Sequence, residues 1–219
     1  MKTFTPFMCS GNQVGLISPQ VVEQLKSYQD VFKISDDFVT LDPKLSSYEE
    51  RSQAIGNVLA DLKARDIFLA LRGWRNECYE IKSAFSDPAL FEMERSATPL
   101  LGVRTFGIHI NGFVNHPENG PSLWFQRRSD TKQTWPGMLD SFVGGGLSVG
   151  YGILETAIKE SQEEANVPEE IALRMKPAGS VSFFYDQGER GIHPQTEFVF
   201  DLELPHEFSP SNNDGEVSQ

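Results

Sequence analysis

The sequence predicts an α/β fold, a mixed sheet flanked by helices, preceded by a small N-terminal α+β module. Three observations predict it. Helical patterns dominate residues 1–98, strand patterns separated by glycine-containing turns dominate from Leu100 onward, and one strong helical pattern at residues 153–165 interrupts those strands. Strands with a single strong helix among them are typical of a sheet that packs against helices. We therefore divide the chain into an N-terminal module, residues 1–98, and a second domain, residues 99–219.

The composition is that of a globular protein with a sizeable core. The chain has 219 residues, of which 39% are hydrophobic and 23% charged. The net charge of −12 argues against a nucleic-acid partner and against binding to an anionic membrane surface. It still permits phosphate ligands, because a metal ion can invert the local charge.

The sequence also predicts a cytoplasmic protein. Its two cysteines, Cys9 and Cys78, have neither metal-binding nor disulfide-framework spacing, which indicates a reducing compartment. The first residues resemble neither a signal peptide nor a transit peptide, and no apolar run reaches the roughly 20 residues needed to span a bilayer. The oligomeric state stays open between monomer and homodimer.

Two helices and two short strands are expected in the N-terminal module. Ser18 and Pro19 begin a first helix as N-cap and first helical residue, and Ser47 and Glu50 begin a second with capping-box spacing. One face of the first helix carries Val21, Leu25 and Tyr28, and one face of the second carries Ile55, Val58, Leu59 and Leu62. The short strands are expected in the stretches "RGWRNECYEI" and "ALFEMER".

Strands are expected throughout the second domain. The stretches that predict them are "VRTFGIHINGFV", "SLWFQRRS", "LDSFVGG", "AGSVSFFYD" and "TEFVFDLELP". In the last of these, apolar residues alternate with polar ones, as in a half-buried strand: Phe198, Phe200, Leu202 and Leu204.

The helix at residues 153–165 carries three glutamates near its end. Its buried stripe is expected to contain Leu154, Ala157, Ile158, Ser161 and Ala165. At about 100° per residue, Glu160, Glu163 and Glu164 are expected together on the opposite side. A solvated acidic face is the ordinary interpretation. However, carboxylates in the last turns of a helix face the negative end of its dipole, at a cost of roughly 0.3–1 kcal/mol each.

A divalent cation would explain this arrangement. The only cation at helical spacing from the glutamates is Lys159, so Mg²⁺ or Mn²⁺ held by Glu160, Glu163 and Glu164 would relieve their repulsion, with phosphate oxygens completing its shell. A glycine triplet precedes the helix, and Gly145 and Gly146 would let the backbone approach a ligand closely.

These residues resemble the Nudix box, in which glycine, a fixed spacer and a glutamate-rich helix follow one another. Gly145 matches the first glycine, and "KESQEE" stands where the family has Arg-Glu, two residues and Glu-Glu. Tyr151 stands in place of the first glutamate of the box, and Asn166, well suited to a left-handed helix C-cap, replaces its glycine. The resemblance implies a Nudix α/β/α sandwich and hydrolysis of a diphosphate with Mg²⁺ or Mn²⁺.

The rest of the chain resembles one branch of that superfamily, the Nudix proteins related to those associated with thiamine pyrophosphokinase. The stretches that carry this resemblance include "GWRNECYEI", "LWFQRRSDTKQTWPGMLDSFVGGG" and "FVFDLELPHEFSPSNNDGEV". It implies that the substrate is thiamine diphosphate or an oxidised or damaged analogue, released as the monophosphate and phosphate. Members of the branch continue beyond "DGEV", which leaves open that the domain is truncated at its C-terminal end.

Several side chains are candidates for contact with such a substrate. Arg127, Arg128 and Lys132 supply cations for a diphosphate. Candidates for stacking on the organic group are Trp74, Trp135 and Phe184, each of which could instead have a packing role. His109 lies among apolar strand residues and is expected to be structural.

The resemblance also implies the chemistry. A water attacks one phosphorus, and a glutamate of the box or of a later loop removes its proton, which makes Glu160, Glu163 and Glu216 the candidate bases. Three alternatives remain. One is a hydrolase of nucleoside diphosphate derivatives such as ADP-ribose, and another is an isopentenyl diphosphate isomerase-like enzyme, whose chemistry needs an active-site cysteine. The third is an inactive binding protein, which the departure at Tyr151 would allow.

Overall fold

The structure is a computed structural model that describes residues 4–132, 135–212 and 215. It divides into two compact units: Met1–Thr105 with Ser182–Gln195, and Phe106–Val181 with Thr196–Gln219. The division between residues 98 and 99 stays a prediction. No helix in the described ranges is long and apolar enough to cross a bilayer.

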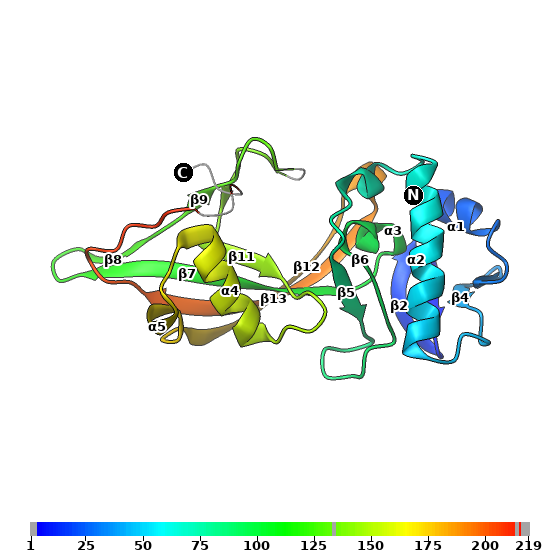
Figure 1. Ribbon diagram of the computed structural model, residues 1–219, viewed down its shortest axis with the longest axis horizontal. Helices are drawn as coiled ribbons and strands as arrows, with labels where there is room; N and C mark the ends of the chain where they lie inside the picture. Colours follow the sequence, from blue (N-terminus) through cyan, green and yellow to red (C-terminus); the bar gives the residue numbers. More distant parts are fainter. Residues whose placement is uncertain (1–3, 133–134, 213–214, 216–219) are drawn as a thin grey trace. The chain divides into compact units, whose positions relative to one another are not determined.

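The first unit is an α+β structure (Figure 1). Its sheet has four strands in the order β2-β1-β4-β3, and β5 and β6 form a separate two-stranded sheet. The strands are β1 (Thr5–Cys9), β2 (Asn12–Ile17), β3 (Phe32–Ile34), β4 (Val39–Leu41), β5 (Cys78–Ile81) and β6 (Phe91–Glu94). The helices are α1 (Pro19–Leu25), α2 (Tyr48–Ala64), η1 (Leu69–Gly73), η2 (Arg95–Ala97) and α3 (Thr98–Leu101).

Both predicted helix starts in this unit are confirmed. The Ser18 hydroxyl accepts from the Val21 N–H, and Ser47 with Glu50 forms the reciprocal capping box. Tyr28 was expected on the first helix but lies beyond its end at Leu25, with its N–H bonded to the Leu25 carbonyl.

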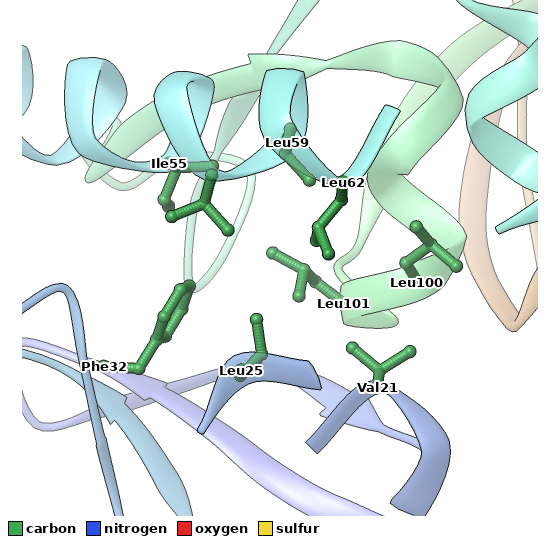
Figure 2. A pocket seen from close by; sticks show the side chains of 9 residues that line it. Val21, Leu25, Phe32, Ile55, Leu59, Leu62, Leu100 and Leu101 are labelled. Atoms are coloured by element: carbon green, nitrogen blue, oxygen red, sulfur yellow. The ribbon is translucent and has the colours of Figure 1, made fainter. Parts of the chain in front are cut away.

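The core of the first unit is formed where the helices meet the sheet. Figure 2 shows apolar side chains of α1, β3, α2 and α3 surrounding a small cavity of about 10 Å³. All four residues predicted for the buried face of α2 are at most 5% exposed: Ile55, Val58, Leu59 and Leu62. So small and wholly apolar a cavity is a packing defect and not a ligand site.

The second unit contains a five-stranded sheet, in the order β11-β7-β13-β12 with β8 paired to β7. The strands that contribute to this unit are β7 (Thr105–His116), β8 (Gly120–Leu123), β9 (Gln126–Arg127), β10 (Leu139–Asp140), β11 (Val143–Gly146), β12 (Lys176–Asp186) and β13 (Ile192–Glu203). Residues 182–195, which include the end of β12 and the start of β13, belong to the first unit. The strands β9 and β10 form a separate two-stranded pair. The helices are α4 (Ile153–Ala165) and α5 (Glu169–Ala172), and the short η3 (Gly188–Arg190) lies in the β12–β13 turn, within the first unit.

The sheet of the second unit is mixed, as expected. Strands β8 and β11 both run antiparallel to β7. The side chain of Asn111 on β7 donates to Asp201 on β13, and the side chain of Asn115, further along β7, donates to Glu203, further along β13. Because the contacts move in the same direction along both strands, β7 and β13 are parallel. Together with α4, which packs against β11 (Figure 1), this confirms the predicted α/β fold class.

The core of the second unit lies between α4 and the sheet. It contains Ile108 and Ile110 of β7, Val143 of β11 and Ala157 of α4, all fully buried. The predicted alternation on β13 is confirmed: Phe200, Leu202 and Leu204 are at most 7% exposed, and Phe198 packs against the same core.

Candidate functional site

Helix α4 begins and ends at the predicted residues because its caps are local. The Glu155 carboxylate accepts from the Gly152 N–H at 2.9 Å, which satisfies a backbone donor at the N-terminus. At the other end Asn166 adopts a left-handed conformation, with φ 53° and ψ 37°, and its N–H bonds the Gln162 carbonyl. Both caps fix the register of the three glutamates relative to the strand below.

The three glutamates lie together on one flank of α4, within about 100° of one another, but not opposite the buried stripe as the sequence predicted. At about 100° per residue, Glu164 lies only about 60° from Ser161 at the centre of the buried stripe, Glu160 about 100° and Glu163 about 160°. The exposed fractions of their side chains follow that order: 3%, 18% and 45%. Glu164 is therefore a buried residue that faces the sheet.

Leu154 was also predicted incorrectly. It was expected on the buried stripe but is 47% exposed. The fully buried residues of α4 begin at Thr156, and in the first turn Ile153 is the apolar residue that packs against the core.

Glu164 forms a defined set of bonds beneath the helix. Its Oε2 accepts from the Gly144 N–H of β11 at 3.0 Å and from the Gln126 Nε2 at 3.1 Å. The Lys132 Nζ lies 3.8 Å from its Oε1. Burial raises the pKa of Glu164 to about 7. The Gly144 N–H, Lys132 and Gln126 favour the ionised form and oppose this shift, whereas the charge of Glu160 adds to it.

Glu160 lies against β11, the strand that contains Gly144, Gly145 and Gly146. A Cβ atom added to Gly145 would come within 2.8 Å of the Glu160 Oε1 and closer still to its Cγ. Glycine is thus required at position 145 so that the Glu160 side chain can lie flat on β11. This is a steric reason for the glycine that precedes the helix.

Glu163 is paired with a lysine on the same helix. The Lys159 Nζ lies 2.6 Å from the Glu163 Oε2 and 3.5 Å from the Glu160 Oε1, so one ammonium group bridges the two carboxylates. With Lys132 beside Glu164, cations already accompany all three glutamates. Lys132 is a second compensating cation, which helical spacing did not reveal.

The donor chemistry of this cluster fits a hard divalent cation. Carboxylate oxygens are the ligands that Mg²⁺ and Mn²⁺ take in proteins. The Lys159 ammonium already occupies a position between Glu160 and Glu163, which shows that these two carboxylates can share one positive charge. In the described part of the chain, no three side chains of His, Cys, Asp or Glu are already gathered as a metal site.

The two predicted phosphate-binding arginines lie at the β9–β10 pair. The Arg127 Nη1 donates to the Gly137 carbonyl at 2.7 Å, and the Arg128 Nη1 donates to the Asp140 carboxylate at 2.7 Å. These contacts hold the connecting loop together. Of the three predicted cations, the structure brings Lys132 to the carboxylate cluster.

The predicted stacking residues lie in different places. Trp135 is 58% exposed in the loop that follows Lys132, with a positive φ of 52°. Trp74 belongs to the first unit, where the Lys63 ammonium lies over its ring and its Nε1 donates to Asn76.

The remaining candidates are placed as follows. Phe184 is 60% exposed and also belongs to the first unit. Gly146 is buried in β11, and Glu216 lies outside the described residues. His109 pairs with Gly144 across β7 and β11, and burial lowers the pKa of its imidazole. Tyr151 is half exposed in the turn before α4.

Gln126 was missed by the sequence analysis. It is 6% exposed and donates directly to Glu164. It follows two aromatic residues in "LWFQRRS", where the neighbouring arginines drew attention to the charges. No local pattern indicates that this amide is buried beneath the helix.

Comparison with known proteins divides the chain near the boundary of the two units. Residues 106–219 match the model of the NUDIX domain, and residues 1–105 match that of a domain of unknown function, DUF4743.

Two plant relatives match nearly the whole chain. Nudix hydrolase 20, chloroplastic, of Arabidopsis thaliana is 37% identical over 223 residues, and Nudix hydrolase 24, chloroplastic, of the same plant is 38% identical over 216 residues. Each alignment covers 98% of this chain and 58% of the relative. The chain thus spans a little over half the length of these two proteins.

A yeast relative and a solved structure extend the comparison. The uncharacterized protein YJR142W of Saccharomyces cerevisiae is 32% identical over 230 residues, which cover 96% of this chain and 67% of that protein. The crystal structure of DR0079 from Deinococcus radiodurans superimposes with a TM-score of 0.46 and 26% identity, covering 65% of this chain and 80% of that one.

Proposed function

This chain belongs to the NUDIX domain family, and from that premise we propose that it hydrolyses a small organic diphosphate with the help of Mg²⁺ or Mn²⁺. The observation that carries the proposal is the placement of Glu160 and Glu164 against the glycine strand. Glu160 lies on Gly145, and Glu164 accepts from the N–H of Gly144. Two of the carboxylates of the family box thus face its glycines.

The proposed metal holders are Glu160, Glu163 and Glu164. When bound, a divalent cation would neutralise the diphosphate oxygens and make the phosphorus more susceptible to attack. The side chains of the chain have their own tasks. Glu164 anchors the end of α4 to β11 through Gly144, and Lys132 beside it supplies a positive charge for a phosphate oxygen.

The proposed reaction is an attack of water on one phosphorus. The new P–O bond forms as the anhydride P–O bond breaks, so that the organic monophosphate and orthophosphate leave. The proton of the water passes to a carboxylate within hydrogen-bond reach. Glu160 and Glu163 are the candidates in α4, where Lys159 bridges them, and Glu216 is the candidate from a later segment.

The proposed substrate is thiamine diphosphate or an oxidised analogue, and the proposed compartment is the cytoplasm. The substrate rests on the resemblance to the thiamine-related branch, and the compartment on cysteine usage. An isomerase of isopentenyl diphosphate is disfavoured. Its chemistry needs an active-site cysteine, but Cys9 is fully buried, and burial raises the pKa of both the Cys9 and the Cys78 thiols, which disfavours a reactive thiolate.

Release of phosphate tests the proposal. Purified protein with Mg²⁺ is given thiamine diphosphate, oxothiamine diphosphate, ADP-ribose or isopentenyl diphosphate, with AMP measured beside phosphate. We expect turnover of the thiamine compounds and a loss of about 100-fold or more in Glu163→Gln. Glu170→Gln, an exposed glutamate on α5, is the matched control and should keep full activity.

The outcomes separate the proposal from its alternatives. Turnover of ADP-ribose alone would refute the thiamine substrate and leave the diphosphate chemistry standing. No turnover of any of the four would refute hydrolysis, and equal activity in Glu163→Gln and Glu170→Gln would refute the role given to the helix.

A further inference from the structure

A pocket of about 310 Å³ in the second unit adjoins the carboxylate cluster. Trp124, Phe125 and Phe142 supply aromatic walls, Glu164 of α4 lies at its border, and residues 209–212 close another side. Pockets that take small molecules begin at about this size, and most are apolar with a few polar groups that fix orientation. Its position beside Glu164 makes it a neighbour of the proposed reaction site.

Two of the aromatic walls are unusually exposed. Phe125 is 62% exposed and Trp124 is 38% exposed, although both are large apolar side chains. The backbone N–H of Trp124 donates to the Gly112 carbonyl of β7, so the backbone that carries the two rings is attached to the sheet. Exposed aromatic rings on two consecutive residues that both line the pocket are available to stack on a planar ligand.

Gln126 gives the pocket a polar recognition group. Its Nε2 donates to the Glu164 carboxylate, and this contact fixes which end of the amide is the nitrogen. Its Oε1 is buried and has no hydrogen-bond partner among the residues that the structure describes. A buried acceptor without a partner destabilises the protein, and a donor on a bound molecule would remove that penalty.

We propose that this pocket binds the organic group of the diphosphate substrate, and that this group is a planar heteroaromatic ring carrying an N–H donor. The inference rests on the proposed function, which it extends to the class of substrate. The ring enters between the exposed side chains of Trp124 and Phe125 and stacks on them, and its N–H donates to the Gln126 Oε1. An alkyl chain such as a prenyl group would leave that oxygen unpaired.

Equilibrium binding tests the proposal without turnover. Calorimetry is run with thiamine monophosphate and with AMP, two monophosphates whose rings carry an amino group, and with methyl phosphate, which has no ring. We expect at least one ring compound to bind more tightly than methyl phosphate. We also expect Trp124→Ala and Phe125→Ala each to weaken its binding about tenfold. Phe38→Ala, which removes a 42% exposed ring from the first unit, should change nothing.

The role of Gln126 is tested by a change in selectivity. The wild type should prefer the bound ring compound about tenfold over its analogue in which the amino group is replaced by hydrogen, because that analogue leaves the Gln126 Oε1 without a donor. Gln126→Met keeps the length of the side chain and should bring the two affinities within about twofold. A merely structural Gln126 would weaken both compounds equally.

Parallel assays of diphosphate hydrolysis distinguish the two proposals. If the wild type hydrolyses a diphosphate while ring binding is unaffected in Trp124→Ala and Phe125→Ala, the pocket inference alone is wrong. It is also wrong if neither ring compound binds better than methyl phosphate. If ring binding follows the expectation but no diphosphate is hydrolysed, the proposed function is wrong.

Discussion

Replacing Glu164 by glutamine should stabilise the second unit at alkaline pH. The folded carboxyl binds its proton more tightly than the unfolded one, because burial raises the pKa of Glu164 to about 7. The stability that this group contributes is complete below the unfolded pKa, near 4.5, and is lost as the pH rises through 7. Glutamine imitates the protonated carboxyl, and its stability contribution does not change over that range.

The size of the effect follows from the same pKa. Each tenfold difference in proton affinity corresponds to about 1.4 kcal/mol. A pKa of about 7 in the folded chain against 4.5 in the unfolded chain therefore gives a difference of roughly 3 kcal/mol between the variant and the wild type at pH 8.5. At pH 4.5 the difference should be near zero.

Urea unfolding at a series of pH values measures this difference. Trp74 belongs to the first unit, whereas Trp124 and Trp135 belong to the second, so fluorescence in a Trp74→Phe background reports on the second unit. The series is run in EDTA for the wild type and Glu164→Gln. The result that would refute the reasoning is a free-energy difference that is the same at pH 4.5 and pH 8.5, or a variant less stable at pH 8.5.

Three further substitutions test single contacts. Gly145→Ala places a Cβ against the Glu160 side chain, and it should lower phosphate release at least about tenfold with an unchanged circular dichroism spectrum. Gly56 lies inside α2, and a Cβ added there would have no described heavy atom of its surroundings within 4 Å. Because alanine favours the helix more than glycine does, Gly56→Ala should raise the free energy of unfolding by about 1 kcal/mol in urea titrations. Ser47→Ala removes the acceptor of the Glu50 N–H and should lower the same quantity by about 1 kcal/mol, whereas no loss would show that the cap is redundant.

The parts of the fold that depend on neighbouring residues were predictable from the sequence. The capping box at Ser47 and Glu50, the helix start at Ser18 and the left-handed Asn166 each depend on groups within four residues. The alternation on β13 likewise reports which face of the strand is buried. Such patterns were sufficient for the mixed sheet and for the exact limits of α4.

The candidate site was predicted less completely because it depends on contacts between distant residues. The burial of Glu164 follows from Gln126 and Gly144, which are 38 and 20 residues away. A charged residue is assigned to solvent unless those partners are known. Leu154 shows the converse error, since its apolar side chain lies on the predicted stripe but is 47% exposed, and helical spacing alone does not show which residues a neighbouring element covers.

The cost of burying Glu164 is itself an argument for function. A glutamine at this position could keep the bond from Gly144 and would avoid a buried carboxylate whose ionisation opposes folding near neutral pH. A carboxylate that weakens the fold is understandable if a cation binds its ionised form, because binding to the folded state alone restores the lost stability. Mg²⁺ should therefore stabilise the wild type more at pH 8.5 than at pH 5, and it should leave Glu164→Gln nearly unchanged at both. Equal stabilisation of the two proteins by Mg²⁺ would separate Glu164 from metal binding and leave it as an anchor of α4.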